Sequence, residues 1–278
     1  MRIPILLLCS AVLIGCSEKP SSVEQQQPPV EPQHAPANQE QPLTYQQRLA
    51  QDAAQGDAEA QLNMALQYLF GAEDAKNAKD DNRAFEWLQK SAAQGKVLAQ
   101  SALGTMYTNG RGAPKDDAKA LEWWEKAASQ GNADCQLKAA LAYANGWAVP
   151  KNDVKAAEWL QKCALQGNVE AEGMLAVAYR DGTGVPKDDI KAAEWTEKAA
   201  MQGDTYSQVR LAGMYGLGKG VPKDEVRAYA WINLVAAQGK DNTAQQRDKI
   251  ENVLTPEQKA EGQKLSAELF SKIKKPTQ

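Results

Sequence analysis

The sequence predicts an all-α fold, an α-solenoid of five 36-residue helical hairpins with capping helices at both ends. Five tryptophans recur at a constant interval of 36 residues, at Trp87, Trp123, Trp159, Trp195 and Trp231. The same interval separates Tyr107, Tyr143, Tyr179 and Tyr215, glycines 95, 131, 167, 203 and 239, and prolines 114, 150, 186 and 222. A fixed period in this range is typical of stacked helical hairpins. We expect the tryptophans to be structural residues that fill the space between neighbouring hairpins.

The second unit shows how the sequence encodes each hairpin. After Gly95, small and apolar residues such as Ala99 and Leu103 recur at helical spacing, which predicts a first helix with one packed side. Segment 110–114 ends that helix, because glycine accepts positive φ and proline cannot continue a helix. Asp116 then lies where an N-cap belongs, and a second helix follows to the next glycine. The matching N-cap positions hold Asp80, Asn152, Asp188 and Asp224.

The repeated residues resemble the Sel-1-like repeat, a relative of the tetratricopeptide repeat. The fourth unit carries the pattern at Gly167, Ala171, Leu175, Tyr179, segment 182–188 (GTGVPKD), Ala192, Trp195 and segment 198–200 (KAA). The resemblance implies a right-handed solenoid with units at 56–94, 95–130, 131–166, 167–202 and 203–238. The first unit has three extra residues around 71–79 and no proline there, so its loop is expected to be irregular.

Both ends of the array look like caps. Segment 43–55 ends in a sequence that echoes the end of each second helix, which predicts a lone helix against the first unit. In segment 239–278, Thr255 is a candidate N-cap, followed by proline at the first helical position and a capping-box glutamine. The closing helix is expected to place Leu265, Leu269, Phe270 and Ile273 on its packed side. The expected total is thirteen helices.

The N-terminus has the features of a bacterial export signal. Residues 1–15 combine one positive charge, an apolar run and a small residue before Cys16. The segment 13–16 (LIGC) resembles the lipobox of bacterial lipoproteins, which implies cleavage before Cys16 and acylation (palmitate-type chains) of this residue; an ordinary cleaved signal is the alternative. Several acyl chains would make membrane attachment stable. Ser17 after the cysteine indicates the outer membrane, with the protein facing the periplasm.

Residues 16–42 contain the acylated cysteine and a segment rich in proline and glutamine. This segment has almost no large apolar residue, so it cannot bury enough surface to offset its ordering entropy. We expect a disordered tether between the membrane and the folded part.

Charge and residue types argue against nucleic-acid binding and against catalysis. Lys and Arg number 32 against 35 Asp and Glu, so there is no basic excess for a phosphate backbone. The sole histidine, His34, lies in the predicted tether, which leaves no histidine-based triad and no histidine zinc site. Acidic pairs such as Asp116 and Asp117 are explained by helix capping. We therefore predict no enzyme activity, no cofactor and no metal.

Two cysteines fall within one repeat. Cys135 and Cys163 are separated by 28 residues and stand where other units have alanines. Facing helices of one hairpin could bring them together, and the periplasm is oxidising. Secreted cysteine-rich members of the resembled family carry hairpin disulfides at a similar separation, although displaced by one residue. A disulfide, two buried free thiols and a redox-active site are the three interpretations.

The first helix of each unit also carries positions not needed for packing. By analogy with tetratricopeptide repeats, these form a partner-binding strip on the inner curve of the solenoid. The strip consists of Leu62, Leu66, Leu98, Thr105, Leu137, Leu141, Val177, Arg180, Tyr206 and Val209. Gly173 and Gly213 on the same side would allow a ligand backbone to approach closely; the alternative is that both glycines are filler without a specific role. An exposed apolar groove commonly marks a protein site. The alternative is that these leucines pack across a tightly wound solenoid.

We therefore predict a lipid-anchored periplasmic protein that binds another protein. The family that the sequence resembles includes immunity proteins that neutralise phospholipase effectors delivered by type VI secretion. It also includes envelope scaffolds or regulators that assemble periplasmic complexes, which is the alternative role. A minor alternative is a β-lactam-binding or β-lactam-hydrolysing enzyme, which no residue of this sequence supports. Partners would be a secreted effector or an envelope assembly component, with membrane contact through the anchor alone.

Overall fold

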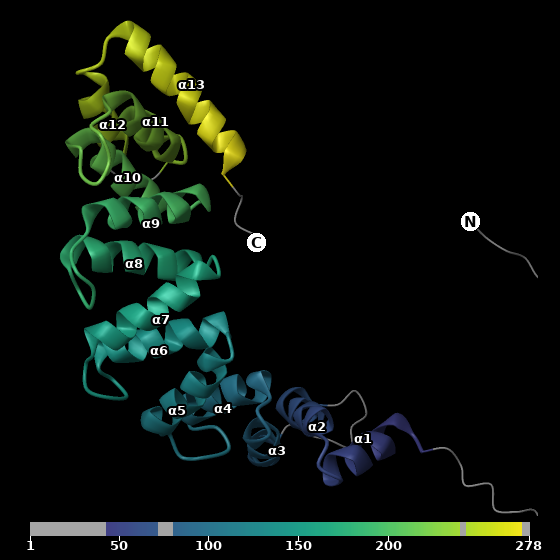
Figure 1. The fold of residues 1–278 in the computed structure, drawn as a ribbon. Helices are drawn as coiled ribbons and strands as arrows, with labels where there is room; N and C mark the ends of the chain where they lie inside the picture. The colour runs from purple at the N-terminus through teal and green to yellow at the C-terminus, as the bar shows by residue number, and fades with distance from the viewer. Residues whose placement is uncertain (1–42, 72–79, 240–242, 274–278) are drawn as a thin grey trace, which may run out of the picture. The chain divides into compact units, whose positions relative to one another are not determined.

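A computed structural model describes residues 43–71, 80–239 and 243–273, and in these ranges the chain forms thirteen α-helices and no strand (Figure 1). The predicted signal peptide 1–15, Cys16, the tether 16–42 and most of the irregular loop 71–79 lie outside the described residues. The folded unit begins at Leu43. The expected all-α solenoid and its number of helices are confirmed.

The helices form five antiparallel hairpins flanked by capping helices. The first helices are α2 (Ala58–Phe70), α4 (Val97–Asn109), α6 (Ala133–Asn145), α8 (Val169–Asp181) and α10 (Thr205–Leu217). The second helices are α3 (Asp81–Ala93), α5 (Asp117–Ser129), α7 (Asp153–Leu165), α9 (Asp189–Met201) and α11 (Glu225–Ala236). The capping helices are α1 (Tyr45–Ala54), α12 (Thr243–Glu251) and α13 (Pro256–Lys272). From α1 to α10, each helix packs mainly against its neighbours in sequence, as the row of helices from α4 onward in Figure 1 shows.

The second to fifth hairpins are closed by the capping pattern that the sequence predicts. The carboxylate of Asp116 accepts a hydrogen bond from the Lys119 backbone N–H at 2.9 Å. The backbone N–H of Asp116 in turn donates to the carbonyl of Tyr107, the tyrosine near the end of the preceding helix, at 3.0 Å. Gly110 ends that helix in the left-handed conformation, at φ 63°. The N-cap predictions are confirmed at Asp80, Asn152, Asp188 and Asp224 as well.

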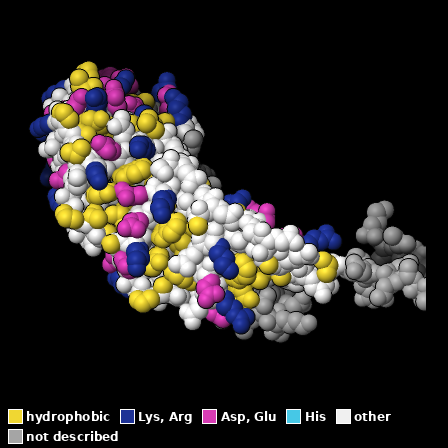
Figure 2. Space-filling view, turned by 60° about the horizontal axis from the view of Figure 1, so that its bottom comes forward, with side chains coloured by type: hydrophobic (Ala, Val, Ile, Leu, Met, Phe, Trp, Pro, Cys, Tyr) yellow, Lys and Arg dark blue, Asp and Glu magenta, His cyan; other side chains and the backbone are white. Residues whose placement is uncertain are grey.

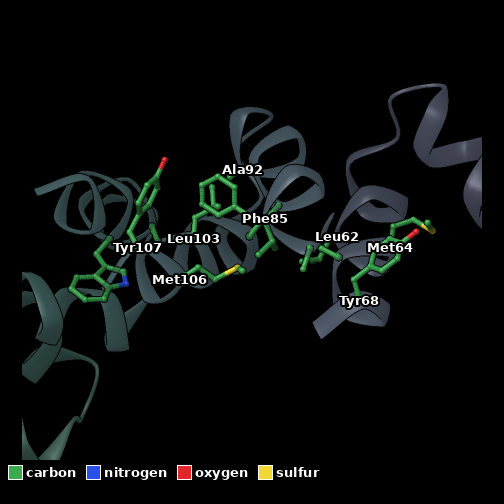
Figure 3. Close-up of a cluster of buried hydrophobic side chains, with 14 of the residues drawn as sticks. Leu62, Met64, Tyr68, Phe85, Ala92, Leu103, Met106 and Tyr107 are labelled. Atoms are coloured by element: carbon green, nitrogen blue, oxygen red, sulfur yellow. The ribbon is translucent and has the colours of Figure 1, made fainter. Parts of the chain in front are cut away.

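Small residues let the helices approach closely in the core. Ala99 and Ala127 are fully buried, and the larger apolar residues fill the space that the alanines leave. In the first units, the Phe85 and Tyr107 rings meet edge to face with centroids 5.2 Å apart. Leu103 lies in the same cluster and is fully buried (Figure 3).

The repeating tryptophans are less buried than the sequence predicts. Trp195 and Trp231 are buried, but Trp87, Trp123 and Trp159 are only half-buried. Each of the first four tryptophans has one ring face covered by the lysine three residues later, with Nζ 3.7–4.2 Å from the ring centroid. Most of these rings therefore lie at the rim between hairpins, and the interior is filled by the residue that follows each tryptophan. These interior residues are Leu88, Trp124, Leu160, Thr196 and Ile232.

Trp159 nevertheless has the linking role that was expected. Its side chain packs against three separate buried clusters, which together extend along the array from the first units to the fifth. A half-buried ring can therefore join neighbouring hairpins. Because much of the indole remains in contact with solvent and Lys162, its removal is expected to cost less than the removal of a fully buried tryptophan.

The second unit has a bulkier interior residue than the others, and one glycine makes room for it. Trp124 is 4% exposed, and a Cβ at Gly104 would overlap its indole ring. The matching first-helix positions hold Ala140, Ala176 and Ala212. Lys138 lies over the same indole at 5.2 Å from the ring centroid. Gly104 is therefore explained by packing.

Buried glutamines connect successive hairpins. In α6, Gln136 is 4% exposed, and its Nε2 donates to the carbonyl of Ala128 at the end of the preceding second helix, at 3.0 Å. Its Oε1 accepts from Gln166, the C-cap residue of the following second helix, at 2.7 Å. We call the series the glutamine ladder. Its first-helix members are Gln61, Gln100, Gln136, Glu172 and Gln208, and its C-cap members are Gln94, Gln130, Gln166 and Gln202.

The ladder satisfies polar groups at interfaces where the repeat pattern predicts only apolar packing. The carbonyls that the ladder reaches already accept from the backbone N–H of the glycine after the helix, as Ala128 does from Gly131 at 3.0 Å. Each donating glutamine side chain adds a second donor from the next hairpin. In the fourth unit Glu172 takes the position and accepts from Gln202 Nε2 at 2.9 Å. At the C-terminal end of the ladder, Gln208 Oε1 is buried without a hydrogen-bond partner in the described part of the chain.

The C-terminal cap differs in one residue from the expectation. The predicted capping box is present, since Thr255 Oγ1 accepts from the backbone of Gln258 at 3.2 Å and Gln258 Oε1 accepts from the backbone of Thr255 at 3.0 Å. Helix α13 packs on α11, where a Cβ at Gly262 would overlap Tyr229. Phe270 is 63% exposed and therefore does not lie on the packed side of α13. The buried residues of this helix are Gly262 and Ser266.

Replacing a central ladder residue tests this account of how the units are joined. We expect Gln136→Met to lower the free energy of unfolding by about 1 kcal/mol, because a side chain of similar length loses both hydrogen bonds. Urea denaturation would measure the shift in midpoint at unchanged slope. The matched control is Gln161→Met, since Gln161 is an exposed residue of α7. Equal midpoints for the two variants would contradict a stabilising role of the ladder.

Candidate functional site

The structure places most of the predicted strip at the surface. Tyr206 and Leu98 are 84% and 65% exposed, and Leu66 is 37% exposed. Thr105 and Arg180 are exposed as well. The half-buried strip residues are Leu137, Leu141, Val177 and Val209. The strip is thus an accessible row of first-helix residues, partly apolar and partly polar.

Leu62 does not belong to this surface. It is 3% exposed and joins the buried cluster that also contains Leu49 of α1 and Leu103 of α4 (Figure 3 shows Leu62 with Leu103). Helix α2 has α1 on one side and α3 on the other, so its side chains have more neighbours than an end helix without a cap would have. For Leu62, the interpretation as a packing residue is therefore correct and the partner-binding prediction is wrong.

Exposed apolar residues alone do not distinguish the strip from the rest of the surface. Val154, Leu165 and Ile190 of the second helices are 56–68% exposed, and single exposed apolar side chains are normal in soluble proteins. Figure 2 shows one face of the molecule, where cationic, anionic and hydrophobic side chains are interspersed. A functional site needs a further feature, such as a hollow.

Two adjoining hollows provide that feature at the C-terminal end of the strip. The larger has a volume of about 650 Å³ and lies between the start of α10 and the start of α12, where Val209 and Thr243 contribute to its wall. The smaller has about 230 Å³ and lies between α8 and α10, with Val177 in its wall. Tyr206 and Arg210 line both. Three predicted strip residues, Val177, Tyr206 and Val209, therefore meet at one place.

A glycine opens the smaller hollow, as its position on the strip suggested. A Cβ at Gly173 would meet only Ser207 Oγ, at the ordinary contact distance of 3.7 Å. A Cβ at Gly213 would meet no atom within 4 Å. No packing constraint therefore explains either glycine, in contrast to Gly104, and both leave space that a bound chain could occupy.

Arg210 is the functional candidate that sequence reasoning missed. Its half-buried guanidinium donates to the carbonyl of Gly173 at 3.4 Å. Burial lowers the pKa of Arg210, and the nearby charge of Arg180 lowers it further, while Asp204 and Asp181 act in the opposite direction. The signal in the sequence was that the matching positions hold Asn63, Ala102, Lys138 and Met174. Only the fold shows that this arginine lines a hollow.

The neighbouring carboxylates already have partners. Arg180 donates two hydrogen bonds to the Asp181 carboxylate, both at 2.8 Å. The pKa of Asp181 is lowered, chiefly by this hydrogen bonding. Asp204 caps α10 and accepts from the Ser207 backbone N–H at 2.7 Å. Glu170, which lines the smaller hollow, is an exposed residue.

The two cysteines are buried free thiols in the structure, which corrects the disulfide interpretation. Cys135 belongs to the cluster of the first units, whereas Cys163 belongs to the next cluster along the array. Cys163 Sγ donates instead to the carbonyl of Ala133 at 3.2 Å. The side chains therefore serve different packing interfaces, although they lie on the same hairpin.

Thiol labelling tests this arrangement. Burial raises the pKa of Cys135, and it raises the pKa of Cys163 to about 11, so neither residue supplies much thiolate at neutral pH. We expect iodoacetamide to label neither residue in the native protein at pH 7.5, and to label both after unfolding in urea without reductant. Mass spectrometry would count the labels. Labelling of the unfolded chain that requires a reductant would demonstrate a disulfide.

The described residues offer neither a metal site nor a membrane span. They contain no group of three or more His, Cys, Asp or Glu that could hold a metal ion. None of the thirteen described helices is both long and apolar enough to cross a bilayer.

Comparison with known families agrees with the hairpin geometry. The Sel1 repeat model matches residues 58–96, 97–132, 133–168, 169–204 and 205–240. The chain belongs to the Sel1 repeat family. Each Sel1 repeat match covers one hairpin and begins two residues after the unit expected from the glycine spacing. Sel1 repeats form protein-interaction modules, so the family places this chain among proteins that bind other proteins.

Similar proteins include solved Sel1 repeat structures. A protective antigen present in uropathogenic Escherichia coli, which displays an SLR fold, is 33% identical, with 81% of this chain and 48% of that chain covered and a TM-score of 0.61. A Sel1 repeat protein from Oxalobacter formigenes is 34% identical, with coverage of 73% and 58% and a TM-score of 0.57. A chitin synthase regulator from Saccharomyces cerevisiae is 44% identical over 62 residues, 22% of this chain and 9% of its own length. This chain thus spans about half of the two structures and a small part of the yeast protein.

Proposed function

We propose that this Sel1 repeat protein is anchored to the outer membrane by lipid, faces the periplasm and binds another protein through the first-helix strip. The observation that carries the proposal is the pair of adjoining hollows at Tyr206 and Arg210, on the strip that the repeat pattern leaves free of packing. Tyrosine and arginine are the residue types that most often dominate binding energy at protein interfaces. Exposed Leu66 and Leu98 extend the apolar part of the surface toward the N-terminal units.

The repeat architecture supports binding to a protein over binding to a small molecule. The strip residues come from all five first helices, so the candidate surface extends over the whole array of hairpins. The two hollows share Tyr206 and Arg210 in their walls, and Tyr206 is 84% exposed, so a protein that lies along the strip can reach both hollows at once. An extended partner surface could contact several units at once.

The anchor is proposed from the N-terminal sequence. Residues 13–16 end in Cys16, and the following segment 17–42 is long enough to separate the folded unit from a membrane surface. Several acyl chains on one residue would hold the protein stably. A membrane-tethered binding module would meet its partner at the place where envelope proteins assemble and where secreted toxins act.

Two finer roles are consistent with such a module. It could neutralise a phospholipase effector delivered into the periplasm, as an immunity protein does, or it could hold components of an envelope complex together as a scaffold. The roles differ in the origin of the partner, which is a foreign toxin in the first and a resident protein in the second. We propose the immunity role, and identification of the bound protein discriminates between them.

Charges placed on the strip test the binding proposal. We expect the triple variant Leu66→Asp, Leu98→Asp, Tyr206→Asp to bind its partner about 100-fold more weakly, because uncompensated charges in a desolvated interface are unfavourable. The measurement is affinity capture by the full chain, first from envelope extracts and then from cells that produce the protein encoded by the gene next to the one for this chain. These three sites are exposed, so helix content by circular dichroism should not change.

A matched triple variant controls for added charge. Val154→Asp, Leu165→Asp, Ile190→Asp adds the same charge at exposed apolar residues of the second helices and should capture the partner at the wild-type level. Capture of a lipase-like effector whose toxicity is relieved by co-expression supports the immunity role, and capture of resident assembly proteins supports the scaffold. Full capture by the strip variant would contradict the proposed site.

The anchor is tested by substitution of the acylated residue. Cys16→Ser should yield an unprocessed or soluble product, because acylation of the sulfur is then impossible. Membrane fractionation and mass spectrometry of the N-terminus would measure the outcome. If the Cys16→Ser protein is cleaved normally and still fractionates with outer membranes, the lipoprotein proposal is wrong.

A further inference from the structure

We propose that the end of the strip at α8 and α10 recognises an acidic segment of the partner protein, with Arg210 binding an aspartate or glutamate side chain and the larger hollow receiving an adjacent apolar side chain. The inference rests on the proposed function and names the chemistry of the partner at the same site. It depends on three features of the described residues. Arg210 has no carboxylate partner, the nearby carboxylates are already bound by other groups or solvated, and apolar space lies beside Arg210.

Arg210 is a cation without a carboxylate partner among the described residues. Its hydrogen bond to the Gly173 carbonyl is long, at 3.4 Å, and no acidic side chain of the described ranges lies within ion-pair distance. A guanidinium has five N–H donors in a fixed fork, so most of them remain available. Removing a charge from water without pairing it is unfavourable, and a carboxylate from a partner would compensate the half-buried cation with a bidentate pair.

The carboxylates around Arg210 have other roles. Asp204 caps α10 through the Ser207 backbone, and Asp181 is held by the fork of Arg180. Glu170 is exposed and solvated. The pKa of Arg210 is lowered by burial first and by Arg180 second, so the opposing influence of Asp204 and Asp181 does not compensate. The guanidinium therefore lies in a local environment that favours an additional negative charge.

Apolar space lies directly beside the cation. Tyr206 is 84% exposed and borders both hollows together with Arg210. The larger hollow, of about 650 Å³, is also lined by Val209 and can accept a large apolar side chain against the tyrosine ring. Gly173 presents no side chain at the smaller hollow, so a peptide backbone can approach there. An acidic residue next to a leucine or phenylalanine would satisfy both parts of the site.

A peptide array tests this specificity even while the partner protein is unidentified. The immobilised probes are acetylated and amidated nonapeptides with a central Asp, Glu, Asn or Gln, flanked by Leu, Phe or Ser. The full chain, purified in detergent, should be retained by peptides that combine an acidic centre with Leu or Phe. Retention should be at least tenfold weaker on the Asn and Gln peptides, and amidated termini ensure that the side chain is being tested.

Variants of Arg210 connect the specificity to the site. Arg210→Met should abolish the preference for acidic peptides, and Arg210→Lys, which keeps the charge but loses the fork, should retain part of it. Arg48→Met is the matched control, since Arg48 is an exposed cation of α1 at the opposite end of the array and its loss should leave the preference unchanged. Circular dichroism verifies that each variant keeps its helix content.

The outcomes separate this inference from the proposed function. Equal retention of acidic and amide peptides, absence of retention on any peptide, or an unchanged preference in Arg210→Met would each overturn the inference. In any of those cases, the strip proposal would still be supported if the triple variant at Leu66, Leu98 and Tyr206 no longer captures the partner protein that the wild-type chain captures. Full capture by that variant, in contrast, contradicts the proposed strip itself.

Discussion

The stacked structure depends on pairing the polar groups that are buried where one hairpin meets the next. Each second helix ends at an interface with the following unit, where a carbonyl such as that of Ala128 accepts from the backbone N–H of the next glycine, Gly131. The glutamine ladder supplies side-chain donors there, as at Gln136 and Ala128, and the C-cap glutamines use the remaining side-chain oxygens. A buried amide without partners is costly, so a buried glutamine such as Gln136 favours the stacking register in which its side chain reaches both Ala128 and Gln166.

Packing is organised around the same interfaces. Alanines allow close helix approach, and the residue after each repeating tryptophan fills the interior, while most of the tryptophans themselves lie at the rim beneath a lysine. Because nearly all contacts join neighbouring helices, a change in one unit affects mainly the next. The pair of Gly104 and Trp124 shows such a local adjustment, in which a bulky interior residue is matched by a glycine on the facing helix.

The same arrangement leaves first-helix residues available for binding. Positions that the ladder and the core do not use differ from unit to unit, from Leu98 in α4 to Tyr206 and Arg210 in α10. At α8 and α10 this variation produces two hollows, a glycine without a packing role and a half-buried cation. Membership of the Sel1 repeat family and this local chemistry together favour a protein partner with an acidic segment.

The repeat, the helices and their caps could be predicted from the sequence because they depend on local chemistry: periodic spacing, N-cap aspartates, positive-φ glycines and prolines act within a few residues of where they stand. The pattern also indicated the strip and the open positions at Gly173 and Gly213.

Other features emerged only from the three-dimensional arrangement. They are the burial of Leu62, the rim position of Trp87 and Trp123, the exposure of Phe270 and the separate packing of Cys135 and Cys163. These features depend on which side chains of neighbouring helices meet, and a period of 36 residues does not specify that. The role of Arg210 has the same origin, since its hollows are formed jointly by α8, α10 and α12.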